Sequence, residues 1–324
     1  MVLSNRVYAI ISSLLIVQRK VAMRLFFKET SIIHWQENSY LVSATLKQML
    51  MLATIITILW WSIGLVRPMQ EGDTIRWADQ ADQYLQGIEG LINPYDVPGF
   101  FNAPWAMVIM FPFNLVPFEI AILLQGILYH CVLTIIAYKF CPAHFDEKSR
   151  RLATLAILTS PFPADLALEL NNDWIPALGL LVPSALSPIF ILTKPQNAIG
   201  YFLAFEWKPL MRAILVGSAT IILSFFIWGH DWILRAYDSI QTDSLGTDFS
   251  AAPITLIGVV PSLLIGTLII TYVLYRVHFK PRSNDTIQHQ RDMALYAIVG
   301  GFFFTPYIAG YSLALIYALL CLLY

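Results

Sequence analysis

Charged side chains are scarce in this sequence. Asp, Glu, Lys and Arg together make up 13% of its 324 residues, whereas an ordinary globular domain carries about 25%. The charges that are present nearly cancel, leaving a formal net charge of −1, so nothing in the overall charge attracts nucleic acid. Composition therefore argues against a water-soluble domain and against a nucleic-acid-binding protein.

Cysteine is also rare, and the usual catalytic motifs are missing. The three cysteines lie in or beside apolar stretches: Cys131, Cys141 and Cys321. Their spacing fits neither a disulfide framework nor a zinc site, and buried, inert thiols are the expectation. No pair of histidines stands four residues apart on a helix, and no phosphate-binding glycine loop or catalytic triad is evident. We therefore predict no metal site.

Long apolar runs are what the sequence has instead. Hydrophobic residues make up 57% of the chain, and a helix needs roughly 20 mostly apolar residues to cross a bilayer. Alternation with a period of two is not visible, which argues against a barrel. The prediction is an all-α, polytopic transmembrane bundle, with spans in or near 48–66, 118–138, 211–228, 253–275 and 293–324.

Charge patterning predicts which segments share a side of the membrane, because loops rich in Lys and Arg stay cytoplasmic. Residues 1–47 hold six Lys/Arg against two acids and form a basic, interfacial lead-in on the cytoplasmic side. Residues 67–102 hold two Arg against six acids, and 229–252 hold one Arg against four Asp. The segments 67–102 and 229–252 are therefore the predicted outer loops, whereas 276–292 is predicted to lie on the cytoplasmic side. Residues 48–324 form one domain.

The middle of the chain allows two interpretations. The basic stretch 139–151 is inside if 103–116 is re-entrant, which is what charge alone favours. Alternatively, six short segments all cross the membrane and 139–151 lies outside. These segments are 103–116, 118–138, 152–168, 175–193, 196–206 and 211–228.

The first outer loop contains the densest set of candidate functional residues. An amphipathic helix over 74–88 is predicted, with Trp77 and Tyr84 on one face, as in helices that lie at a membrane interface. Asp73 stands at its start, where a carboxylate either caps the helix or serves as a general base for an acceptor at the membrane surface.

Two other places carry charge within apolar sequence. Lys194, followed by Pro195 and Gln196, is either a lysine snorkelling from a helix end or a ligand for phosphate. Asp165 and Glu169 precede Asn172 and Asp173. Acids at membrane depth are functional candidates, although this segment can equally be a loop near water.

Together these pieces resemble the GT-C-fold membrane glycosyltransferases, and most closely family 87, which uses polyprenyl-phosphate mannose. The resemblance rests on an acid after the first span, an aromatic helix, an Asn-Pro-Tyr turn, a Pro-led helix, a Lys-Pro-Gln step and a late Pro-Tyr step. In this sequence they are Asp73, Trp77, Tyr84, Asn93-Pro94-Tyr95, Asn102-Ala103-Pro104-Trp105, Lys194-Pro195-Gln196 and Thr305-Pro306-Tyr307.

The resemblance implies about nine spans with two main outer loops, and so favours the six-crossing interpretation of the middle. It implies inverting transfer of a mannose-like hexose from a polyprenyl-phosphate donor, with Asp73 as the base. Lys194 and Gln196 would bind the donor phosphate. Trp77, Asn93, Tyr95, Asn102 and Tyr307 would line the substrate pocket.

The same resemblance implies a multi-pass protein of the cell (plasma or inner) membrane, with a cytoplasmic N-terminus and membrane lipids as its surroundings. It implies no cofactor and leaves assistance by a divalent metal open. The family's late Trp-x-His element is missing here, and the middle of the chain is short. The alternative hypothesis is therefore a non-catalytic GT-C-like subunit of a larger membrane assembly.

Overall fold

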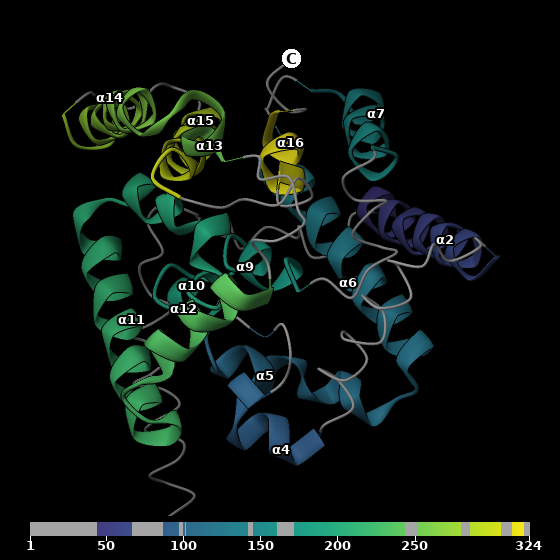
Figure 1. Cartoon of the computed structure of the whole chain (residues 1–324). Coiled ribbons are helices and arrows are strands. Elements are labelled where there is room, and N and C mark those ends of the chain that lie inside the picture. Colours follow the sequence, from purple (N-terminus) through teal and green to yellow (C-terminus); the bar gives the residue numbers. More distant parts are fainter. Residues whose placement is uncertain are drawn as a thin grey trace, which may run out of the picture.

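The computed structural model of the chain describes residues 44–66, 87–96, 100, 102–141, 145–160, 172–243, 252–279, 286–305 and 313–320. Within these ranges every regular element is an α-helix or a 3-10 helix (Figure 1). The predicted all-α class is confirmed for this part of the chain.

Among the described residues, three helices are long and apolar enough to cross a membrane. They are α6 (Phe118–Lys139), α11 (Trp207–Trp228) and α14 (Val259–His278). At 1.5 Å per residue, twenty to twenty-two residues reach about 30 Å, the thickness of the hydrocarbon. Each follows from an uninterrupted apolar run, and the spans predicted at 118–138, 211–228 and 253–275 overlap them.

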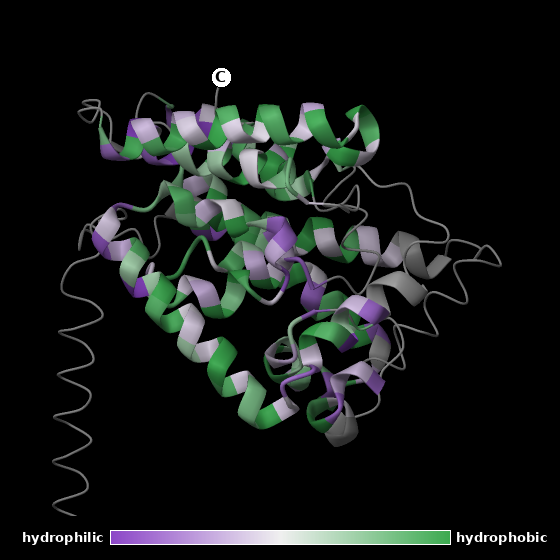
Figure 2. Ribbon diagram, turned by 60° about the vertical axis from the view of Figure 1, so that its left-hand side comes forward, coloured by the Kyte–Doolittle hydropathy of each residue, from purple (hydrophilic) through white to green (hydrophobic). Residues whose placement is uncertain are grey.

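The three long helices differ in what surrounds them. α6 lies inside the bundle, whereas α11 and α14 expose large apolar side chains, including Leu215, Phe226 and Leu268. Figure 2 shows mostly hydrophobic colours along the length of α11. In water such surfaces would be unstable. They fit helices whose outer faces contact lipid.

α2 (Ala44–Val66) packs against α6 in the opposite direction. The Trp61 indole donates a hydrogen bond to the Glu119 carbonyl at 3.0 Å, near the amino end of α6. Further along, the Thr57 hydroxyl and His130 Nδ1 lie 2.6 Å apart and are buried between the two helices. The amino end of α2 therefore lies toward the carboxyl end of α6, beside α7 (Glu147–Leu158).

α15 (Thr286–Phe302) joins α14 to the centre of the molecule, and α16 (Ala314–Leu320) packs against α15 and α6. The contact of α15 with η4 (Ile199–Ala204) is unusually close. A Cβ placed on Gly200 would lie 1.9 Å from the Ala297 carbonyl oxygen. Only glycine lets the two backbones approach this closely.

Three helical elements from the two predicted outer loops pack together. α4 (Gly87–Ile92) and η1 (Pro94–Asp96) come from the end of the first loop, and α12 (Trp232–Asp243) comes from the second. Arg235 Nη2 lies 2.6 Å from Asp96 Oδ1, and the Trp228 indole donates to the Leu91 carbonyl at 2.7 Å. The described parts of the two loops, 87–96 and 229–243, therefore lie side by side.

The expected nine-span arrangement is not confirmed. The segment expected to cross at 175–193 consists of two one-turn helices, α9 (Trp174–Leu178) and α10 (Ser187–Ile191), joined by turns. The segment expected at 196–206 is 3-10 helix, comprising the end of η3 (Pro195–Asn197) and η4. Near 103–116, α5 (Trp105–Met110) and η2 (Phe111–Leu115) form a short helical piece. The helix within 152–168 ends at Leu158, and 161–171 lie outside the described residues.

Proline explains the broken middle. Prolines stand at 176, 183, 188 and 195, and each lacks the N–H that would continue a helix. A further short helix, α13 (Pro253–Ile257), precedes α14 and ends at Gly258, whose φ of 87° is easily adopted by glycine.

Candidate functional site

The broken segment from Asn172 to Phe205 forms the centre of the molecule. In Figure 1, α9 and α10 lie between α6 and α11, with α15 and α16 beyond one end and α5 beyond the other. Most of its residues are buried. Irregular backbone at membrane depth is stable only where protein covers it or where it lines a polar cavity, and binding sites of membrane proteins commonly use such segments.

A buried ion pair joins the two ends of this segment. Lys194 Nζ lies 2.5 Å from Asp173 Oδ1, and the side chains are only 6% and 3% exposed. Asp173 immediately precedes α9, and Lys194 immediately precedes η3, so the chain reversal between them brings the charges together. An unpaired charge at this depth would cost several kcal/mol, and each residue spares the other most of that cost.

The lysine step is also attached to the end of the first loop. The Ala103 N–H donates to the Thr193 carbonyl at 2.9 Å, and the Trp105 indole donates to the Ile189 carbonyl at 2.8 Å. The Tyr95 hydroxyl in turn donates to the Asn102 carbonyl at 2.9 Å. The end of the first loop (95–105) therefore meets the segment 189–194, which is distant from it in sequence, within a few residues of Lys194.

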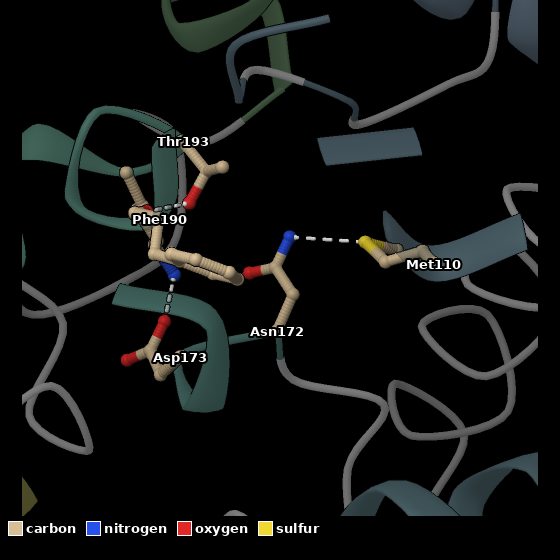
Figure 3. A network of polar contacts seen from close by, with 6 residues as sticks. Met110, Asn172, Asp173, Phe190 and Thr193 are labelled. Atoms are coloured by element: carbon tan, nitrogen blue, oxygen red, sulfur yellow. Dashed lines mark hydrogen bonds and ion pairs between the residues drawn. The ribbon is translucent and has the colours of Figure 1, made fainter. Parts of the chain in front are cut away.

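Four buried amide side chains belong to this part of the molecule. Asn102, Asn172, Asn197 and Gln125 are all buried. The Asn172 amide nitrogen points to the sulfur of Met110 at 3.6 Å, as Figure 3 shows, with Phe190 on its other side. Gln125 of α6 accepts a hydrogen bond from the Trp174 indole at 3.2 Å.

Two of these amide oxygens accept no hydrogen bond from the described residues: Oδ1 of Asn102 and Oδ1 of Asn197. A buried acceptor without a donor costs about 1–3 kcal/mol, so a water or a ligand hydroxyl is the natural partner for each. Asn102 directly precedes Ala103, whose N–H donates to the Thr193 carbonyl. The Asn197 N–H donates to the Lys194 carbonyl at 3.1 Å. Both acceptors therefore belong to the neighbourhood of the ion pair.

Tyr95 links this neighbourhood to the surface of α12. Its ring contacts Phe100 on one side, and the Arg235 guanidinium lies over it, 5.5 Å from the ring centre. Burial raises the pKa of Tyr95 well above its ordinary value, and the charge of Arg235 offsets this only in part. Tyr95 is thus a neutral donor at any physiological pH, which suits its hydrogen bond to the chain at Asn102.

Five of the predicted site residues can be placed, and three of them come together. Tyr95, Asn102 and Lys194 belong to one connected neighbourhood. Asn93 is exposed, and its carbonyl accepts from the Asp96 N–H at 3.1 Å. Gln196 is half-buried in η3. The predicted base Asp73 and the predicted pocket residues Trp77 and Tyr307 lie outside the described residues, as do Tyr84 of the expected interfacial helix and the acids Asp165 and Glu169.

Asp173 is the functional candidate that sequence reasoning undervalued. Acidic residues within apolar sequence are functional candidates. In this part of the sequence that criterion favours Asp165 and Glu169 over Asp173. Nothing in the linear sequence pairs residue 173 with residue 194, because their contact depends on how the intervening prolines fold the chain back. Within the described residues, no group of three His, Cys, Asp or Glu side chains is arranged to hold a metal ion.

No family model, curated protein or solved structure matches this chain. Functional inference therefore rests on the chain's own chemistry and on the motifs it resembles. A buried cation with amide groups around it can bind an anionic group and orient hydroxyl groups. The pair lies next to the end of the first loop and alongside α6, where Trp174, the neighbour of Asp173, donates to Gln125.

Proposed function

We propose that the protein is a membrane glycosyltransferase that moves a sugar from a polyprenyl-phosphate donor to an acceptor hydroxyl at the outer face. The observation that supports this most is the attachment of the first-loop residues Tyr95 and Asn102–Ala103 to the Thr193–Lys194 step. The proposed reaction requires the first loop, which carries the base, and the phosphate-binding residue Lys194 to lie on the same side of the membrane. The contact supports this for the end of the first loop.

In the proposed reaction, the acceptor oxygen attacks the anomeric carbon as the bond from that carbon to the phosphate oxygen breaks. Asp73 takes the proton of the acceptor hydroxyl, and polyprenyl phosphate leaves with the bonding electrons. Lys194 and Gln196 bind the phosphate, where a fixed cation of low hydration stabilises the developing charge. Asn102 and Tyr95 belong to the sugar-binding side of the pocket, together with Trp77, Asn93 and Tyr307. A mannose-like hexose is the sugar that the resemblance favours.

The ion pair has a specific place in this proposal. Lys194 needs a counter-ion while no donor is bound, and Asp173 supplies it. A donor phosphate offers Lys194 a second anion, so binding shares the lysine between two partners or shifts it from one to the other. A polyprenyl chain and its headgroup also have a natural route to the site through the bilayer, which lowers the entropic cost of the encounter.

The pair also favours the alternative function. A lysine fully neutralised by a neighbouring aspartate can be a purely structural element, as expected for a non-catalytic GT-C-like subunit of a larger membrane assembly. That reading predicts that the pair can be replaced by apolar residues without loss of any activity, because buried ion pairs are often no more stable than apolar substitutes.

The experiment is sugar transfer by the purified full chain in lipid nanodiscs, from a panel of polyprenyl-phosphate sugars. The informative variant is Lys194→Met/Asp173→Leu, which removes both charges and so leaves no unpaired charge to unfold the protein. We expect it to remain folded and to lose about 10²–10³-fold in transfer rate, as when one transition-state donor is removed. Lys208→Met, which alters an exposed lysine of α11, is the control and should keep the rate. Equal rates in all three proteins would contradict the role of Lys194, and no transfer by any of them would favour the structural subunit.

A further inference from the structure

The helix α7 has two distinct faces. Thr154, Ile157 and Leu158 are buried, and Leu158 packs with Ala53 and Ile56 of α2. The opposite face holds residues spaced by three and four, which share one side of a helix. Its exposed members include Glu147, Lys148 and Arg151 in the first half, and Leu152 and Leu155, 56% and 38% exposed, in the second.

This exposed face therefore changes from charged to apolar along the helix axis. Twelve residues of helix span about 18 Å, which is enough to reach from the headgroup layer into the outermost acyl chains. The acids Asp146 and Glu147 stand at the amino terminus, where they cap the helix and complement its dipole. A helix with cations at one end and leucines at the other fits the boundary between headgroups and hydrocarbon.

More positive charge lies beside α7. Cys141, just after α6, is close to both Arg150 of α7 and Arg291 of α15, and Arg150 also makes a side-chain hydrogen bond to it. Burial raises the pKa of the Cys141 thiol, and the two guanidinium groups oppose that rise. Arg291 is almost fully buried and is held by Asp292, 2.6 Å away. Lys139 is the last residue of α6, two residues before Cys141.

We propose that the exposed face of α7 is a binding surface for anionic phospholipid headgroups, with Lys148 and Arg151 on the phosphates and Leu152 and Leu155 among the acyl chains. The occupant is the membrane itself, because α7 packs on α2, which exposes the large apolar side chains Met51, Ile55 and Leu59, and because α7 offers cations beside that apolar surface. Each Lys or Arg near a bilayer surface strengthens binding to anionic lipid by about fivefold. Two such residues together predict about a 25-fold preference.

The test uses the full chain, released from nanodiscs made of phosphatidylcholine and phosphatidylglycerol, with native mass spectrometry to count the lipids retained. Wild type should retain phosphatidylglycerol selectively. Lys148→Gln/Arg151→Gln should lose about 25-fold of that selectivity, with an unchanged thermal midpoint in phosphatidylcholine alone. The matched control, Lys208→Gln/Arg212→Gln on α11, removes the same charge and should keep the selectivity.

Two results would overturn the proposal. Selectivity that survives in the α7 variant would show that these two side chains do not bind the headgroups. Selectivity lost equally in the α11 control would show that it reflects total charge and not a surface on α7. Neither result depends on sugar transfer, so the lipid surface and the proposed enzyme can fail separately.

Discussion

Lys194 and Asp173 show at the scale of single residues how the bundle tolerates charge. Each comes from a different end of the broken central segment, and each is nearly inaccessible to water. The surrounding amides and the attachment of Ala103 to Thr193 fix the geometry of the lysine step. The pair therefore acts as a unit, and the consequences of changing one member differ from those of changing both.

We predict that the single variants Lys194→Met and Asp173→Leu each lose about 3–5 kcal/mol of stability, because each leaves an uncompensated buried charge. The double variant should lie close to wild type, since both charges have gone. Unfolding in mixed micelles, followed by circular dichroism, measures all four proteins of this cycle. A double variant whose loss equals the sum of the two single losses would show that the residues do not interact.

A second prediction concerns the cap of α7. Asp146 Oδ1 accepts a hydrogen bond from the Ser149 N–H at 2.7 Å. Hydrogen bonding with the Ser149 side chain, together with this backbone bond, lowers the pKa of Asp146 below its ordinary value. Because the folded-state pKa is the lower one, the stabilisation is present above the unfolded-state pKa and is lost as pH falls through the folded-state value. Hydrogen exchange at the Ser149 amide should therefore be protected at neutral pH and lose that protection in strong acid. The variant Asp146→Ala should lack the protection at every pH, and a pH-independent wild type would argue against the cap.

The elements divide into those that the sequence could predict and those that it could not. α6, α11 and α14 follow from long apolar runs, since twenty apolar residues have few alternatives to a helix in lipid. The segment 172–205 carries four prolines between 176 and 195 and forms short helical pieces, so the crossings that the resemblance favoured there are not confirmed. Tyr95, Asn102 and Lys194 were chosen by their motifs, whereas Asp173 required the three-dimensional path of the chain.

Packing between elements yields a prediction at Gly200. Its added Cβ would meet the backbone of α15 at Ala297, which cannot move without shifting a whole helix. Gly200→Ala should therefore destabilise the protein by about 3 kcal/mol, at the upper end of overpacking costs. Gly217→Ala is the matched control, because its Cβ meets only side chains of Leu192 and Pro188, at 3.3 Å. Thermal midpoints of the two variants in the same detergent make the comparison, and equal midpoints would contradict the close approach of η4 and α15.

At the scale of the whole molecule, charge is unevenly distributed about α6. Its amino end carries Glu119 and lies near the element pair α4–η1, where Asp96 pairs with Arg235 of α12. Its carboxyl end carries Lys139 and leads to Arg150, Arg151 and the nearby Arg291. Since 22 helical residues reach about 33 Å, the two groups are separated by the thickness of a bilayer.

This arrangement favours the interpretation in which 103–116 is re-entrant and 139–151 lies inside, over the six-crossing interpretation that the resemblance favoured. We predict that Lys148→Cys and Asp238→Cys react with impermeant maleimides from opposite sides of sealed vesicles, in a background whose three native cysteines are serine. Lys148→Cys should label from the cytoplasmic side. Labelling of both positions from one side would restore the six-crossing interpretation.

The most direct test of the account as a whole is the rate of sugar transfer by wild type, Asp73→Asn and Asp79→Asn. Asp79 lies in the same loop and serves as the matched control. We predict sugar transfer by wild type and by Asp79→Asn. In Asp73→Asn the rate of transfer should fall by about 10²–10⁴-fold, which is the contribution expected of a general base. Transfer that persists at the wild-type rate in folded Asp73→Asn would contradict the assignment of that residue as the base. Absence of transfer in folded wild type with every donor would contradict the enzyme itself.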